Sequence, residues 1–304
     1  MLGPLTFAGA AVAAGAVALS TAAAGRRAWG GSRGLAALSV LAGTAAGGWL
    51  VGGLSPLPPR VAVVRLLVVG LPLAAATEAV AAGQRLRRLA PVVRGVAALV
   101  IVRVLLHDSV HLQMEATAGR TAVLGAAALA ALAWPFVAAG ERRIDGGIVA
   151  VVAVMVSLLA AALAIPMAGY VKGGLVAALL AVAVTGSLAG GGRSGLSGFG
   201  FAALMGIVVV GRFFGGLSSP AAVLLCMPPV LTVAAGHVGD LLGDEAAGRV
   251  IRSAAYRLAV AIVPLVVVLA QSWTDFDSSF RRMVVPPSGL DASPASSLSR
   301  ENSR

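Results

Sequence analysis

Residues 147–167 read GIVAVVAVMVSLLAAALAIPM, an apolar run that contains no charged side chain. A helix needs roughly 20 apolar residues to cross the hydrocarbon core of a bilayer, so this run predicts a transmembrane helix. The composition agrees with it: of 304 residues, 59% are apolar and 12% are charged, which leaves too little polar side-chain surface for a soluble domain. The sequence therefore predicts an integral membrane protein.

Comparable runs follow one another along the chain, separated by links that carry Arg, Gly and Pro, and they number about ten. They cover residues 4–24, 35–54, 61–82, 92–112, 121–139, 147–167, 172–189, 199–217, 221–241 and 251–271. The predicted fold class is all-α, a polytopic membrane helix bundle. Its transmembrane domain spans residues 1–271, and the Ser- and Pro-rich tail 272–304 is expected to be disordered because it lacks apolar periodicity.

Basic residues alternate between the links and so predict the orientation of the chain. The first link holds Arg26, Arg27 and Arg33, and the third link is similarly rich in arginine, whereas Arg60 is alone in the second. Short cytoplasmic loops carry the excess of arginine and lysine, so the odd links are expected to be cytoplasmic and the N-terminus outside. The net charge of +11 then belongs to links beside lipid headgroups, not to a nucleic-acid surface. The Ala-, Gly- and Arg-rich composition suggests a bacterial chain, which predicts the inner membrane.

Charged residues inside the apolar runs are the candidates for function, because a charge in hydrocarbon costs at least about 2.5 kcal/mol without a partner, water or a role. Arg65, Arg103 and Arg212 are expected at similar depths in the outer half, with His107 and Asp108 nearby. Planar guanidinium groups suit carboxylate or phosphate, so the three arginines are predicted to bind an anionic substrate. The alternative is that they extend to the outer interface.

A second group is expected near the cytoplasmic side. It comprises Glu78, His237 and Asp240, and together with His107 and Asp108 these residues are the candidates for proton coupling. The alternative is an interfacial cluster of ion pairs at a helix end, with Arg249 or Arg252 as the partner.

The stretch HDSVH, residues 107–111, differs from the zinc-protease pattern His-Glu-x-x-His by one methylene. His107 and His111 are spaced to share a metal, but a catalytic zinc needs a third ligand. The other histidine, His237, is expected at a different depth, so no metal or cofactor is favoured. The single cysteine, Cys226, provides no disulfide framework.

The favoured function is a secondary transporter or permease for a small anionic solute. Two alternatives stay open: a membrane-embedded enzyme that acts on a lipid or lipid-linked substrate, and a non-catalytic membrane subunit of a larger complex. An enzyme is the less favoured of these classes. The expected partners are the lipid bilayer and the solute, with oligomers through small-residue helix faces such as Gly43 with Gly47 and Gly211 with Gly215.

Overall fold

The computed structural model describes residues 4–29, 33–50, 61–83, 86, 88–107, 117–140, 144–191, 195–243 and 246–284. Throughout these residues the regular elements are helices, and eight of them are long and apolar enough to cross a membrane. The predicted fold class, an all-α polytopic membrane bundle, is confirmed. The chain is a multi-pass membrane protein.

Every predicted apolar run corresponds to helical structure. The helices are α1 (Pro4–Trp29), α2 (Arg33–Leu50), α3 (Ala62–Arg65), the π-helix η1 (Leu66–Gly70), α4 (Leu71–Ala81), α5 (Ala90–Leu105), α7 (Thr117–Gly140), α8 (Ile144–Met167), α9 (Val171–Ala189), α10 (Leu196–Phe214), α11 (Ser219–Leu241), α12 (Ala246–Arg252) and α13 (Ala254–Val284). The third predicted run is the continuous column of α3, η1 and α4. The short helix α12 was not predicted.

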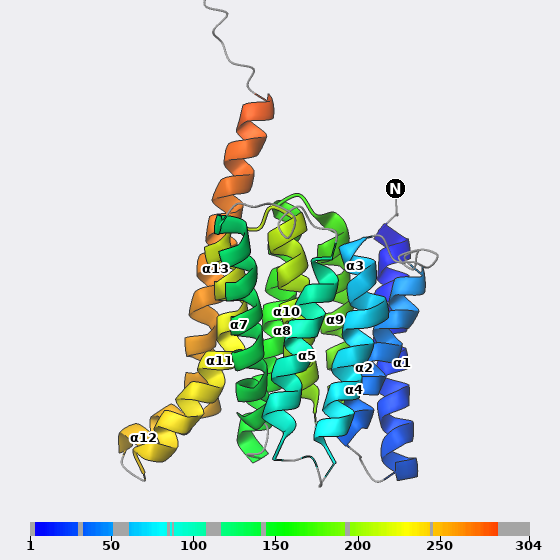
Figure 1. Ribbon diagram of the computed structural model, residues 1–304, viewed down its shortest axis with the longest axis vertical. Helices are drawn as coiled ribbons and strands as arrows, with labels where there is room; N and C mark the ends of the chain where they lie inside the picture. Colours follow the sequence, from blue (N-terminus) through cyan, green and yellow to red (C-terminus); the bar gives the residue numbers. More distant parts are fainter. Residues whose placement is uncertain are drawn as a thin grey trace, which may run out of the picture.

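The helices stand side by side in an up-and-down arrangement (Figure 1). We call the end of the bundle that holds the start of α1 the upper end, and the end that holds Arg26 and Arg27 the lower end. Helices α3, α9 and α11 begin at the upper end, and α5, α8, α10 and α13 begin at the lower end. The arginine-rich end predicted to be cytoplasmic is therefore the lower end.

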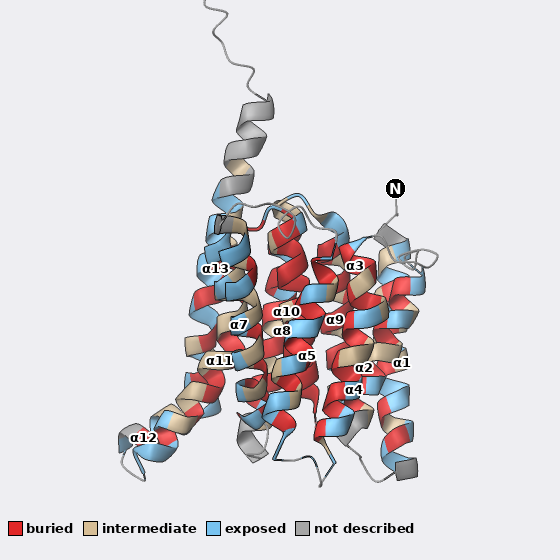
Figure 2. Ribbon diagram, in the orientation of Figure 1, coloured by how far each residue is buried: buried red, intermediate tan, exposed pale blue. Residues whose placement is uncertain are grey.

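Helix α10 is the centre of the bundle. It contacts α2, α3, η1, α4, α5, α7, α8, α9 and α11, and nearly all of its side chains are buried. The outward faces of α1, α7 and α13 are exposed in contrast (Figure 2). These faces are apolar, so they are the surfaces that meet lipid acyl chains.

The third column is interrupted by a turn of π-helix. Pro72 has no N–H for a bond to the carbonyl of the preceding turn, and its ring crowds that carbonyl. The wider turn Leu66–Gly70 lies just before it, where the N–H of Leu71 bonds to Leu66 O, five residues back. Single π-turns of this kind concentrate at functional sites.

Two helix ends differ from the predicted limits. Helix α5 ends at Leu105, well before residue 112, because the polar stretch that begins at His107 follows at once. Helix α13 continues past residue 271, the predicted end of the transmembrane domain, and its last turns stand beyond the upper end of the bundle (Figure 1).

Candidate functional site

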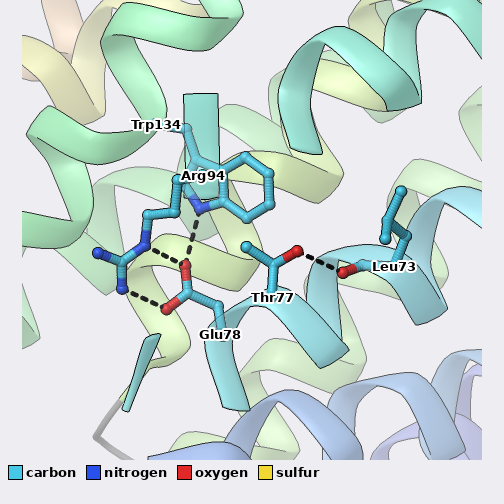
Figure 3. A network of polar contacts seen from close by, with 5 residues as sticks. All are labelled: Leu73, Thr77, Glu78, Arg94 and Trp134. Carbon is cyan, nitrogen blue, oxygen red and sulfur yellow. Dashed lines mark hydrogen bonds and ion pairs between the residues drawn. The ribbon is translucent and has the colours of Figure 1, made fainter. Parts of the chain in front are cut away.

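A buried ion pair with an aromatic partner lies in the lower part of the bundle (Figure 3). The Arg94 Nε donates to Glu78 Oε1 over 2.8 Å, and its Nη2 donates to Oε2 over 2.6 Å. The indole N–H of Trp134 also donates to Oε1, over 2.8 Å. Glu78 is 2% exposed, Trp134 is 1% exposed and Arg94 is 8% exposed, so the three side chains form one enclosed polar cluster. We call it the Glu78 cluster.

Three helices of the bundle hold the cluster. Glu78 is in the last turn of α4 and Arg94 is near the start of α5, so both lie about 5 Å inside the lower helix ends, from the rise of 1.5 Å per residue. Trp134 extends from α7. The neighbouring Thr77 takes no part, because its hydroxyl donates to Leu73 O within α4 over 2.7 Å (Figure 3).

A glycine of the central helix makes room for the carboxylate. A Cβ added to Gly198, near the start of α10, would lie 2.5 Å from Glu78 Oε1 and 3.0 Å from Ala138 Cβ. Neither distance leaves space for a methyl group. Helix α10 can therefore approach the Glu78 cluster this closely only because position 198 has no side chain.

Arg94 and Glu78 neutralise each other through two parallel hydrogen bonds. Both carboxylate oxygens accept from the guanidinium, a planar geometry that fixes orientation as well as charge. Within the described chain, Arg94 Nη1 makes no hydrogen bond.

Directly above the cluster, a small cavity follows the seam between α5, α7 and α10. Its volume is about 10 Å³, and it is lined by Ala98, Ile101, Val102, Ala130, Trp134, Ala202, Met205 and Gly206. This is about the least space that holds one water molecule. The seam is closed to any solute in this conformation.

The other lower-end candidates form a separate group. His237 Nδ1 bonds to Val233 O over 2.8 Å, and its ring stacks on Phe136 of α7 with centroids 5.6 Å apart. Asp240 follows on the exposed side of α11. Among the described residues, no hydrogen bond joins His237 to Glu78, so α7 separates the two groups, with Trp134 facing one and Phe136 facing the other.

The outer arginines lie at upper helix ends with different neighbours. Arg65 Nη1 donates to the backbone carbonyl of His107, which brings these two predicted residues together. Arg103 is exposed in the last turn of α5, since that helix ends at Leu105. Arg212 is in the last turn of α10, where its Nε donates to Ser219 Oγ over 2.8 Å. His107 is exposed just past the end of α5.

The weak metal candidates, His107 and His111, stay predictions. His111 and Asp108 lie outside the described residues. Among the residues that the structure does describe, no group of three or more histidine, cysteine or carboxylate side chains could hold a metal ion.

Arg94 and Trp134 were missed by the sequence reasoning. Arg94 had a detectable pattern, because it lies inside the run 92–112, four residues after the start of α5, and Glu78 lies three residues before the end of α4. In an antiparallel helix pair, such positions reach the same depth. Trp134 had none, since nothing in the sequence shows which face of α7 meets α4.

The comparisons with known proteins give no family to which the chain could be assigned: no family model matches it, and neither does any curated protein or solved structure.

Proposed function

We propose that the protein is a proton-coupled secondary transporter for a small anionic solute, and that the Glu78 cluster is its coupling element. The observation that carries this proposal is the buried ion pair Glu78–Arg94 inside a membrane bundle. Buried ion pairs add little stability compared with apolar residues of similar volume, so stability alone is a weak reason for one. Ionisable groups within membrane bundles commonly belong to substrate or proton paths.

Coupling follows from the charge balance at Arg94. When Glu78 is ionised, it neutralises Arg94 and occupies its donor fork. When Glu78 takes up a proton, Arg94 can bind the carboxylate or phosphate of a solute on the same donors. Both arrangements are neutral overall, whereas a site with both anions or with neither carries a net buried charge. The proton and the anion therefore move together.

The surrounding helices have features suited to opening the closed seam. The third column contains the π-turn η1 followed by Pro72, and α7 contains Pro135 beside Trp134. Interrupted helices line substrate paths in many transporters. In the proposal, movement of α7 and α5 away from α10 enlarges the small cavity above Trp134 until it admits the solute.

The remaining candidates have supporting roles in this proposal. Arg65, Arg103 and Arg212 attract anions to the upper end, where the backbone carbonyl of His107 accepts a hydrogen bond from Arg65. His237 and Asp240, on the other side of α7, provide a separate proton route at the lower surface, which is the cytoplasmic face of a bacterial inner membrane. Each of these roles is separate from the exchange at Arg94.

The test is proton flux in proteoliposomes that contain a trapped pH-sensitive dye. Inward gradients of phosphate, succinate, citrate and glutamate are imposed one at a time, since these anions cross lipid slowly. With wild-type protein, at least one gradient should acidify the lumen faster than in protein-free liposomes. Arg94→Gln should abolish this flux, and Glu78→Gln should retain anion exchange but lose acidification.

Arg27→Gln, at the exposed lower end of α1, is the control and should match wild type. Full flux in Arg94→Gln, or flux no faster than in protein-free liposomes for all four anions, would contradict the proposal.

A further inference from the structure

An apolar groove opens on the side of the bundle between α7, α10 and α11. Its volume is about 170 Å³, and its wall is entirely apolar. Leu129 of α7 and Val223 of α11 line it and are 52% and 45% exposed, so the groove faces outward into the surrounding bilayer. Met205 and Val209 of α10 form its floor.

A guanidinium group lies at the upper end of this groove. The aliphatic part of Arg212 belongs to the wall, and its Nε donates to Ser219 Oγ over 2.8 Å. The guanidinium carbon is also 5.8 Å from the centroid of the Phe213 ring. These contacts orient the side chain and leave its two Nη atoms without a hydrogen bond to any described residue. Two parallel donors therefore remain available for an anionic group.

The combination of an apolar wall and one oriented cation complements an amphiphile. A free anion would gain nothing from the wall, and a neutral hydrocarbon would gain nothing from Arg212. An apolar cavity of about 150 Å³ holds a benzene molecule, so about 170 Å³ encloses a segment of roughly six chain carbons. The upper ends of α10 and α11 lie where a bilayer has its headgroups, which places a lipid phosphate at the height of Arg212.

We propose that this groove is a binding site for an anionic phospholipid, with part of one acyl chain between α7 and α11 and the phosphate on Arg212. The site does not use the exchange at Arg94, and it gives Arg212 a lipid phosphate to bind in addition to its role in attracting solute anions. It distinguishes an anionic lipid from a zwitterionic one, because the ammonium of a zwitterionic headgroup offsets the attraction of the phosphate to Arg212.

The test is native mass spectrometry of protein extracted from nanodiscs that contain equal amounts of phosphatidylglycerol and phosphatidylcholine. Wild-type protein should retain one phosphatidylglycerol with a preference of about tenfold, the effect expected of one charge-assisted contact. Arg212→Gln should remove the preference. Ala222→Phe, and separately Ala126→Phe, should fill the groove and reduce retention of both lipids. Two filling variants on different helices guard against one that fails to fold.

Arg103→Gln is the matched control, since Arg103 also lies in the last turn of a helix at the upper end but is exposed away from the groove. It should retain the wild-type preference. If Arg103→Gln and Arg212→Gln lose the preference for phosphatidylglycerol equally, the preference comes from general surface charge and the proposal is overturned. Undiminished retention in both filling variants, displacement of the lipid by glycerol phosphate, or no preference in wild type would also overturn it.

Discussion

Removing Arg94 should destabilise the protein far more than removing Arg94 and Glu78 together. In Arg94→Leu, the carboxylate of Glu78, whose side chain is 1% exposed, loses two of its three donors and keeps only Trp134. An unpaired buried charge costs about 3–5 kcal/mol. Because the indole hydrogen bond remains, we expect the free energy of unfolding to fall by about 3 kcal/mol. In Glu78→Leu, the side chain of Arg94 is 10% exposed and can extend toward the lower surface, so we expect about 2 kcal/mol.

The double variant leaves neither charge in the bundle. Only the indole N–H of Trp134 loses its acceptor, so the free energy of unfolding should fall by about 1 kcal/mol. The two single losses add to about 5 kcal/mol, so the coupling energy between Arg94 and Glu78 is expected to be about 4 kcal/mol.

The assay is reversible unfolding in mixed micelles with increasing sodium dodecyl sulfate, followed by circular dichroism. Arg103→Leu, an exposed arginine on the same helix as Arg94, serves as the control and should stay within about 0.5 kcal/mol of wild type. If the double variant is destabilised by the sum of the two single variants, the residues are not energetically coupled and the reasoning is wrong.

Gly198→Ala should lower the free energy of unfolding by about 1–3 kcal/mol, because the new methyl group would lie 2.5 Å from the carboxylate of Glu78. Gly125→Ala is the control, since no atom lies within 4 Å of the added carbon. It should be neutral or slightly stabilising in the same unfolding assay. The orientation is tested with a membrane-impermeant maleimide on intact cells, in a Cys226→Ser background that removes the only cysteine. Lys172→Cys at the upper end should react from outside, and Arg249→Cys at the lower end should react only after permeabilisation; the reverse pattern would invert the predicted topology.

Hydrophobic run length predicted the helices well, because the bilayer imposes one length requirement on every spanning segment. What run length did not predict is how each helix is rotated about its axis, and therefore which side chains face each other. Glu78 was grouped with His237 and Asp240 of α11 because of their similar depth, whereas its hydrogen-bond partners are Arg94 of α5 and Trp134 of α7. Depth can be calculated along one helix from its rise, whereas neighbours across helices depend on packing that a single sequence does not show.

The estimated depth of Arg103 illustrates the same limit at a helix end. A run of apolar residues continuing to residue 112 places Arg103 well inside the membrane, and a partner is then expected. The polar residues from His107 onward end α5 early, so the arginine lies in its last turn and is exposed. Helix termini depend on local competition for backbone hydrogen bonds, which apolar run length does not measure.

The central position of α10 has a consequence for the order of events during biosynthesis. Arg94 follows Glu78 by 16 residues and Trp134 follows it by 56 residues. At about 5–20 residues per second, these partners leave the ribosome roughly 1–3 s and 3–11 s after Glu78, and Gly198 follows after about 6–24 s. Glu78 can therefore be neutralised by Arg94 almost as soon as the hairpin of α4 and α5 enters the membrane. The hairpin must then persist without its central support until α10 is synthesised, and this interval is when the nascent bundle is most exposed to misassembly and to quality-control proteases.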